Sequence, residues 1–340
     1  MTAELHDQML ESYTTLRVGG LADRVVIATT QEEIVATVAE CDDASIPLLI
    51  LGGGSNVVIS DDGWRGTVLL IRTSGFEVAA DACSGATVTV EAGVWLDDFI
   101  AECVAREWSG LEVLSGIPGT IGGTPIQNVG AYGQDVSQTI AKVRTYDRVE
   151  KSLKTFLFAD CEFGYRTSIF KKNPERYVIL DVTYQLRLGD HSQPINYAEL
   201  AAVLGVEVGQ RSKLAAVREN VLKLRADKAM VLDELNHDTW SAGSFFTNPI
   251  VDAKTASQLP ETASQWPQAE GRVKVSAAWL IEHAGMKKGF SLNDCAALSS
   301  KHTLAITNRG DATAADILDL AHHIQHQVHE RFGINLSIEP

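Results

Sequence analysis

Residues 47–56 read Pro-Leu-Leu-Ile-Leu-Gly-Gly-Gly-Ser-Asn, an apolar run that leads directly into three consecutive glycines. The segment 47–51 has the length and composition of a short buried strand. Glycines after such a strand let the backbone approach a ligand closely and turn its N–H groups inward around an anion. The stretch therefore predicts a phosphate-binding loop, with a plain tight turn as the alternative.

Two familiar glycine motifs do not fit this loop. A P-loop requires Gly-Lys-Ser/Thr, and no lysine follows Gly54. A Rossmann fingerprint requires a third glycine at the position where Val57 stands. The loop therefore belongs to neither of these two classes.

The segments around this loop predict a small α/β unit. Residues 23–28 and 66–71 have the composition of strands. Thr30 stands where it can cap a helix over 31–41. Strand and helix signals that alternate in this way are typical of α/β architecture.

A second glycine-rich passage, residues 115–133, lies between two predicted strands, 87–93 and 177–184. It holds six glycines and two prolines in nineteen residues. A loop this long inside a compact domain is usually functional, and its composition fits a rigid backbone wrapped around a flat polar cofactor. An ordinary surface loop is the alternative, but such loops rarely keep so many apolar residues, here Ile117, Ile121, Ile126 and Val129.

The C-terminal region predicts two helices, over 213–225 and over 314–331. Apolar residues in the second helix recur at helical spacing and form one stripe, Ile317, Ala321, Ile324 and Val328. Its four histidines lie off this stripe, so a polar solvent face is a better interpretation than a metal site: His322, His323, His326 and His329.

The composition of the chain bounds its class. With 340 residues, of which 45% are hydrophobic, it is too long for one compact core, and two or three domains are expected. No apolar run approaches the roughly 20 residues of a membrane span, and the first residues lack the basic region of a signal peptide. The net charge of −15 disfavours nucleic acid as a partner and means that an anionic ligand needs a local pocket of cations and N–H groups.

The five cysteines are scattered, and none forms a C-x-x-C pair. This spacing argues against a zinc site and against a disulfide framework. The cytoplasm is the compartment that we expect. The cysteines are Cys41, Cys83, Cys103, Cys161 and Cys295.

Motifs along the whole chain, taken in order, resemble those of the UDP-N-acetylenolpyruvoylglucosamine reductases. The opening segment 14–20 is similar to that of the family, and the loops 51–56 and 116–133 resemble its FAD loops. The remaining motifs resemble a substrate-clamping segment, a proton-donor segment, a third-domain helix and the tyrosine loop of one family subtype, type I; they are 163–171, 242–249, 274–285 and 193–200.

The resemblance implies an α+β fold of the vanillyl-alcohol-oxidase (VAO/PCMH) type. Two α/β subdomains, 1–75 and 76–221, would bind FAD. A third α+β domain, 222–340, would bind the substrate, and its C-terminal strand would return to the active site.

The resemblance also implies an activity, namely NADPH-dependent reduction of the enolpyruvyl group of UDP-N-acetylglucosamine-enolpyruvate. The product would be UDP-N-acetylmuramate, a precursor of peptidoglycan, and the cofactors would be FAD and NADPH. We expect a cytoplasmic monomer with a small-molecule substrate, no nucleic-acid partner and no membrane.

Three residues match the catalytic positions of the family. Arg166 suits the substrate carboxylate because its planar fork matches carboxylate geometry. Ser244 would donate a proton to the enolate-like carbon, for which hydrogen-bond reach is required. Glu339 has the family's spacing from the strand residue Leu336. It would sit beside the substrate, either protonated or sharing a hydrogen bond.

The same resemblance implies the binding residues. Those for the substrate would be Tyr165, Tyr197, Lys228, Asn248 and His302, of which His302 replaces a glutamine of some relatives. Those for FAD would be Gly52, Gly53, Gly54, Ser55, Asn56, Ile117, Pro118, Gly122, Gly123, Gln127, Asn128, Gly130 and Tyr132.

Two alternatives stay open at this point. One is another FAD-linked oxidoreductase of the same fold; such enzymes often tether flavin through His or Cys, which the Gly52 loop lacks. The other is an inactive flavin- or nucleotide-binding protein, which the retained residues Tyr165, Arg166, Ser244 and Glu339 disfavour. A nucleophilic serine is a poor interpretation of Ser244, because Phe246 stands where G-x-S-x-G ends.

Overall fold

The computed structural model describes residues 3–81 and 85–340, and Cys83 lies outside them. The chain divides into two compact units. Unit 1 takes the N-terminal residues up to Gln8 and the segments Ala22–Gly54 and Trp64–Ala226. Unit 2 takes Met9–Leu21, Ser55–Gly63 and Asp227–Pro340.

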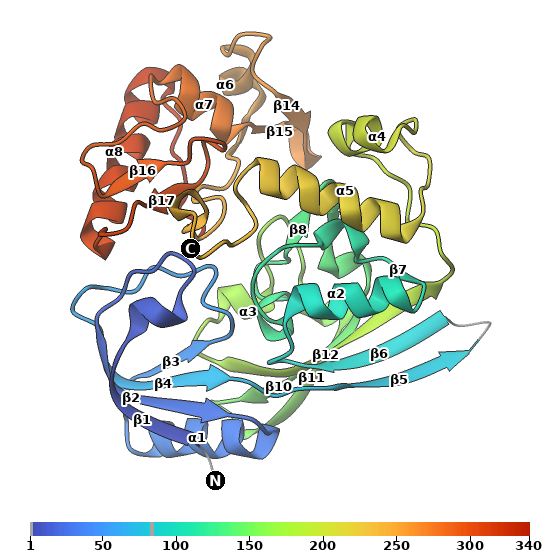
Figure 1. The fold of residues 1–340 in the computed structure, drawn as a ribbon, viewed down its shortest axis with the longest axis vertical. Helices are drawn as coiled ribbons and strands as arrows, with labels where there is room; N and C mark the ends of the chain where they lie inside the picture. The colour runs from blue at the N-terminus through green and yellow to red at the C-terminus, as the bar shows by residue number, and fades with distance from the viewer. Residues whose placement is uncertain (1–2, 82–84) are drawn as a thin grey trace. The chain divides into compact units, whose positions relative to one another are not determined.

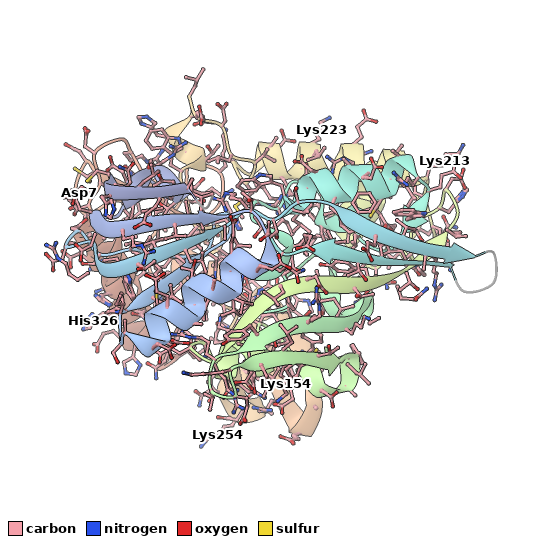
Figure 2. The ribbon with its side chains drawn as sticks, turned by 90° about the horizontal axis from the view of Figure 1, so that it is seen from below. Asp7, Lys154, Lys213, Lys223, Lys254 and His326 are labelled. Carbon is pink, nitrogen blue, oxygen red and sulfur yellow. The ribbon has the colours of Figure 1, made fainter. Side chains whose placement is uncertain are left out.

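Unit 1 begins with a four-stranded sheet in the order β1-β2-β4-β3. Its strands are β1 (Ala3–Met9), β2 (Leu21–Ala28), β3 (Leu48–Leu51) and β4 (Trp64–Ile71), and β4 runs parallel to both β2 and β3. The helix α1 (Gln31–Asp43) lies along one face of the sheet (Figures 1 and 2).

The helix α1 begins where the sequence predicts. The Thr30 hydroxyl accepts a hydrogen bond from the N–H of Glu33, which satisfies one of the open donors of the first turn. Ile34 and Val38 on its inner face are fully buried in the core of unit 1.

A six-stranded antiparallel sheet forms the rest of the framework of unit 1, in the order β11-β10-β12-β6-β5, with β7 on the end of β12. Figure 1 shows α2 (Leu96–Ala105) over this sheet and α5 (Leu214–Asp227) beyond α2. Phe99 of α2 packs on Tyr184 of the central strand β12, with ring centroids 5.6 Å apart. The strands are β5 (Phe76–Asp81), β6 (Gly85–Glu91), β7 (Trp108–Ser109), β10 (Ile140–Asp147), β11 (Ser152–Leu157) and β12 (Tyr177–Leu188).

The second glycine-rich passage is packed against the core of unit 1. Ile121 is fully buried, and Ile117 and Val129 are partly buried against the core, whereas Ile126 is 41% exposed. This burial contradicts an ordinary surface loop. The short elements in and around the passage are η2 (Glu112–Leu114), η3 (Ile121–Gly123), β8 (Gly130–Ala131), β9 (Gln134–Asp135), η4 (Val136–Gln138), η5 (Phe158–Cys161), α3 (Ile169–Lys172) and α4 (Ala198–Leu204).

Unit 2 has its own core between α7 (Ala277–His283) and α8 (Ala314–Phe332). The predicted stripe of α8 is fully buried there, and Thr313 and Asp316 close the start of the helix as a capping box. The other elements are η1 (Leu10–Tyr13), η6 (His237–Thr239), β13 (Ile250–Asp252), α6 (Ala253–Ser257), β14 (Gln265–Pro267), η7 (Ala269–Gly271), β15 (Arg272–Val275), β16 (Ala296–Leu298) and β17 (Ile306–Asn308).

The histidines of α8 lie away from its buried stripe. His326 projects from the helix into solvent (Figure 2), and His323 stacks on Phe290 with ring centroids 5.7 Å apart. Among the described residues no group of three His, Cys, Asp or Glu side chains could hold a metal ion. Within the same part of the chain, no helix is long and apolar enough to cross a membrane.

The boundaries of the two units differ from those of the three domains expected from the sequence. Strands from 1–75 and from 76–221 share one continuous core in unit 1, and 9–21 and 55–63 belong to unit 2. The division into 1–75, 76–221 and 222–340 concerns where ligands bind and stays a prediction.

Candidate active site

The two glycine-rich loops of unit 1 touch each other. A β-carbon added at Gly52 would lie 2.3 Å from Oγ1 of Thr120, and one added at Gly53 would lie 2.6 Å from Cα of Gly119. Only glycine permits so close an approach at these two positions. The guanidinium of Arg72 donates to the carbonyl of Gly52 at 2.8 Å and fixes the first loop from behind.

This pair of loops fits a flat dinucleotide cofactor. Gly54 has a φ of +61°, a backbone conformation that glycine adopts without strain. A β-carbon at Gly122 would press on Ala92 at 2.8 Å, whereas one at Gly123 would meet nothing within 4 Å. The loops therefore present main chain with few side chains, as a site for the phosphates and ring of FAD requires.

Asp97 fixes the start of the second loop, a role that the sequence analysis missed. Its Oδ1 accepts a hydrogen bond from the N–H of Gly116 at 2.6 Å. The guanidinium of Arg218 on α5 donates to both carboxylate oxygens of Asp97, at 2.6 and 2.8 Å. Burial raises the pKa of Asp97, but the bonds from Arg218 and Gly116 outweigh it, and the pKa lies below its usual value. No local sequence motif predicts this contact, because it joins three segments that lie far apart in the sequence.

Tyr165 and Arg166 form the tip of a tight turn. Gly164 and Thr167 pair across it, and the N–H of Gly164 donates to the carbonyl of Thr167 at 3.0 Å. Arg166 has a φ of +53°, which is uncommon for a residue with a side chain and is found at functional sites. Its guanidinium lies over the Tyr165 ring, 5.8 Å from the centroid.

This turn is fastened to the second glycine-rich loop. Arg166 donates through Nη2 to the carbonyl of Gly130 at 2.9 Å and through Nη1 to that of Asn128 at 3.3 Å. The hydroxyl of Ser168 donates to the carbonyl of Ile126 at 2.5 Å. The structure thus brings the proposed carboxylate-binding arginine to the predicted cofactor loop within unit 1.

Tyr132 and Tyr197 meet edge to face, with ring centroids 5.4 Å apart and planes at 87°. Tyr132 closes the second glycine-rich loop, and burial raises its pKa to about 12. Tyr197 stands at the start of α4 and is 40% exposed. Arg225 of α5 is buried beside Tyr132, and burial lowers the pKa of its guanidinium while Tyr132 and Asp97 raise it.

Ser244 and Glu339 come together in unit 2. Phe246 and Ile338 form an antiparallel bridge, and the N–H of Glu339 donates to the carbonyl of Phe245 at 2.9 Å. Phe245 and Phe246 are almost fully buried, so they anchor the half-buried Ser244 between them and Gly243. Asn56, at the end of the first glycine loop, donates through Nδ2 to the carbonyl of Glu339 at 3.5 Å. Ser55 and Asn56 belong to unit 2, unlike Gly52–Gly54.

Three further residues that the sequence predicts to bind the substrate lie in unit 2. Lys228 is half-buried directly after α5. Asn248 accepts through Oδ1 from the N–H of Ala277 at 2.9 Å, at the start of α7. The N–H of His302 donates to Oγ of Ser299 at 3.2 Å, in a turn that Asp238 holds.

Two family models match separate parts of the chain. Residues 233–340 match the family model of the UDP-N-acetylenolpyruvoylglucosamine reductase C-terminal domain, and residues 22–151 match that of an FAD binding domain. The UDP-N-acetylenolpyruvoylglucosamine reductase of Cutibacterium acnes is 53% identical over 98% of this chain and 89% of its own length. That of Streptomyces coelicolor is 51% identical over 99% of this chain and 89% of its own length.

A solved structure has the same fold. The UDP-N-acetylenolpyruvylglucosamine reductase of Thermus caldophilus superimposes with a TM-score of 0.65 at 22% identity, over 100% of this chain and 97% of that one. With the FAD-domain match, it confirms the predicted fold class. On the high identity over nearly its whole length, the chain belongs to the UDP-N-acetylenolpyruvoylglucosamine reductase family.

Proposed function

We propose that this chain reduces the enolpyruvyl group of UDP-N-acetylglucosamine-enolpyruvate to give UDP-N-acetylmuramate, with FAD as its cofactor and NADPH as the reductant. The reaction belongs to the synthesis of peptidoglycan precursors. The observation that carries the proposal is the fastening of the Tyr165–Arg166 turn to a glycine-rich loop that itself touches Gly52 and Gly53. The identity to the curated relatives supports the same activity.

FAD bound at these loops would supply hydride-transfer chemistry, with NADPH as the source of the hydride. Its contacts would come from the backbone of the two loops, at Gly52–Gly54 and Gly122–Gly123, and from Gly130. The other contacts carried over from the sequence are Ser55, Asn56, Ile117, Pro118, Gln127 and Tyr132, together with the backbone of Asn128.

Arg166 would bind the carboxylate of the substrate and stabilise the negative charge that develops beside it. A guanidinium suits this task because two parallel N–H groups match the two carboxylate oxygens. Charge stabilisation by groups that are already in position is usually a large part of catalysis. The bonds from Arg166 to Asn128 and Gly130 support such positioning, because they fix the plane of the guanidinium.

Ser244 would deliver the proton to the carbon that has not received the hydride. A serine is a weak acid, so it donates only to a strongly basic carbon held within hydrogen-bond reach. Glu339 would lie beside the same carbon and share a hydrogen bond with the substrate. The pairing of Glu339 with Phe245 supports a common site for Ser244 and Glu339.

The diphosphate of the substrate would need cations in a protein with a net charge of −15. Lys228 would bind the pyrophosphate, and Tyr165, Tyr197, Asn248 and His302 would contact the rest of the substrate. We also propose a cytoplasmic monomer that works without nucleic acid or a membrane, in keeping with its acidic composition.

One spectroscopic experiment tests the proposal. The purified protein should show a flavin spectrum that NADPH bleaches and that the enolpyruvyl substrate restores under anaerobic conditions. Bleaching without recovery would indicate another FAD-linked oxidoreductase of this fold. A flavin that NADPH does not bleach would indicate an inactive binding protein.

A further inference from the structure

We propose that Asn128 is a positioning residue, which sets the orientation of the Arg166 guanidinium from inside the second glycine-rich loop. The proposal rests on the function proposed above and deepens it. It gives the side chain of Asn128 a role in holding the protein together and leaves the cofactor contact expected from the sequence to the backbone of this residue.

Both ends of the Asn128 amide are used within the protein. Its Nδ2 donates to the carbonyl of Gly164 at 3.1 Å, and its Oδ1 accepts from the N–H of Ser137 at 3.1 Å. The residue is only 4% exposed. Unmade hydrogen bonds are costly at such a buried site, so these two bonds hold the side chain in one orientation.

The backbone of Asn128 makes a second connection to the same turn. Its carbonyl accepts from Nη1 of Arg166 at 3.3 Å, while its side chain holds the carbonyl of Gly164. The φ of Asn128 is +48°, a conformation that asparagine tolerates better than most residues. Asn128 therefore contacts the Gly164–Thr167 turn at its base and at its tip.

These contacts control where the guanidinium points. Arg166 has a φ of +53°, so the turn is under backbone strain and needs neighbours that hold it. If the bond to Gly164 is lost, the base of the turn is no longer held in place. The guanidinium of Arg166 then loses the orientation in which its two N–H groups face the two oxygens of a carboxylate. Misplacement of a reacting group by about 1 Å can cost on the order of 100-fold in rate.

The test uses Asn128→Asp, which keeps the acceptor for Ser137 and removes the donor to Gly164. Flavin content and the rate of bleaching by NADPH should stay as in the unmodified protein. Reoxidation by the enolpyruvyl substrate should slow by roughly 10- to 100-fold, and the KM for that substrate should rise. The matched control is Asn220→Asp on α5, whose Nδ2 donates to a carbonyl of its own helix, that of Ala216.

A double-variant cycle with Arg166→Lys separates positioning from general stability. If Asn128 acts through Arg166, adding Asn128→Asp to Arg166→Lys should slow reoxidation little further, because the fork is already gone. Full additivity of the two effects would overturn the proposal. So would loss of flavin from Asn128→Asp, or equal slowing of both half-reactions.

Asn128→Gly serves if the buried carboxylate of Asn128→Asp prevents folding. Glycine adopts the positive φ freely and removes both side-chain bonds. The same difference between the two half-reactions is expected, and its absence would contradict the proposal. The unmodified protein separates a failure of the proposed function from a failure of the role of Asn128. If NADPH does not bleach the unmodified protein, the proposed function fails, whatever the variants do.

Discussion

The N–H of Glu339 donates a hydrogen bond to the carbonyl of Phe245 at 2.9 Å, and this bond joins the C-terminal residues to the segment that carries Ser244. Thr247 and Ser337 extend the same pairing, with 3.1 Å between the N–H of Thr247 and the carbonyl of Ser337. The bonds are made by the backbone, so a change of side chain at either position leaves them in place. The chemistry of each side chain can therefore be tested apart from the fold.

Glu339→Gln should slow substrate-dependent reoxidation of the flavin and leave the melting temperature nearly unchanged. The backbone pairing persists, while the ionisable group beside the substrate is replaced by an amide. A loss of roughly 10²–10⁴-fold is expected for an acid–base group. Stopped-flow absorbance measures the rate, with the exposed Glu330→Gln of α8 as a control. A rate equal to that of the control would remove Glu339 from the active site.

Ser244→Ala should still be bleached by NADPH at a near-normal rate, because reduction of the flavin does not need its proton. Reoxidation by the enolpyruvyl substrate should slow by roughly 10²–10⁴-fold. The control is Ser257→Ala, an exposed serine of α6 whose hydroxyl donates to a local carbonyl, that of Lys254. Equal slowing of both half-reactions, or a large fall in melting temperature, would mean that Ser244 has a structural role.

Gly52→Ala should weaken FAD binding, because its new methyl group would collide with Oγ1 of Thr120 and separate the loops. The Thr120→Ala change should restore much of the binding, since Cβ of Thr120 would then be the nearest atom of that residue, at an ordinary contact distance of 3.5 Å. Fluorescence titration of the apoprotein with FAD measures both. If the double variant binds no better than Gly52→Ala, the collision is not the cause.

Asp238→Asn should lower the free energy of unfolding by about 1.5–3 kcal/mol at neutral pH, the usual range for hydrogen bonds to a charged group. Asp238 accepts from Ser299 and from Ser300 and pairs with Arg309 at 2.8 Å. Burial raises its pKa, but these bonds prevail and hold the pKa below the usual value. Such a group stabilises the fold above its unfolded pKa and loses this effect as the pH falls through its folded pKa.

The difference between the unmodified protein and Asp238→Asn should therefore be full at pH 5 and above. It should shrink only below about pH 3.9, the ordinary pKa of an aspartate. Urea unfolding at several pH values measures it, with the exposed Asp319→Asn as a control. A difference that disappears already between pH 7 and pH 5 would show that Asp238 is not ionised as described.

Local patterns in the sequence were sufficient for elements whose signal lies within one segment. The Thr30 cap, the strand before Gly52 and the stripe of α8 are examples, because propensity, capping and burial agree there. The strand β1 was missed because its residues are nearly all exposed and show no apolar alternation.

Contacts between distant segments could not be predicted from local patterns. The residues Asp97 and Gly116, like Asn128 and Gly164, meet only because the sheet and helices bring their segments together. Family resemblance identified Asn128 as a residue of interest, but nothing in the sequence specified where its amide points. The motifs therefore predict which residues take part in the chemistry. The hydrogen bonds that hold those residues in position can be found only in the three-dimensional structure.

The passage of the chain between the units has a consequence for synthesis on the ribosome. Leu16 and Val18 are made early, yet they are buried against residues such as Phe245 and Leu336 in the core of unit 2. These two side chains, and Val58 with them, stay without their native cover until the segments that carry Phe245 and Leu336 have been translated. Unit 2 therefore completes its core only after these later segments have left the ribosome, and the nascent chain carries exposed apolar residues that chaperones can bind until then.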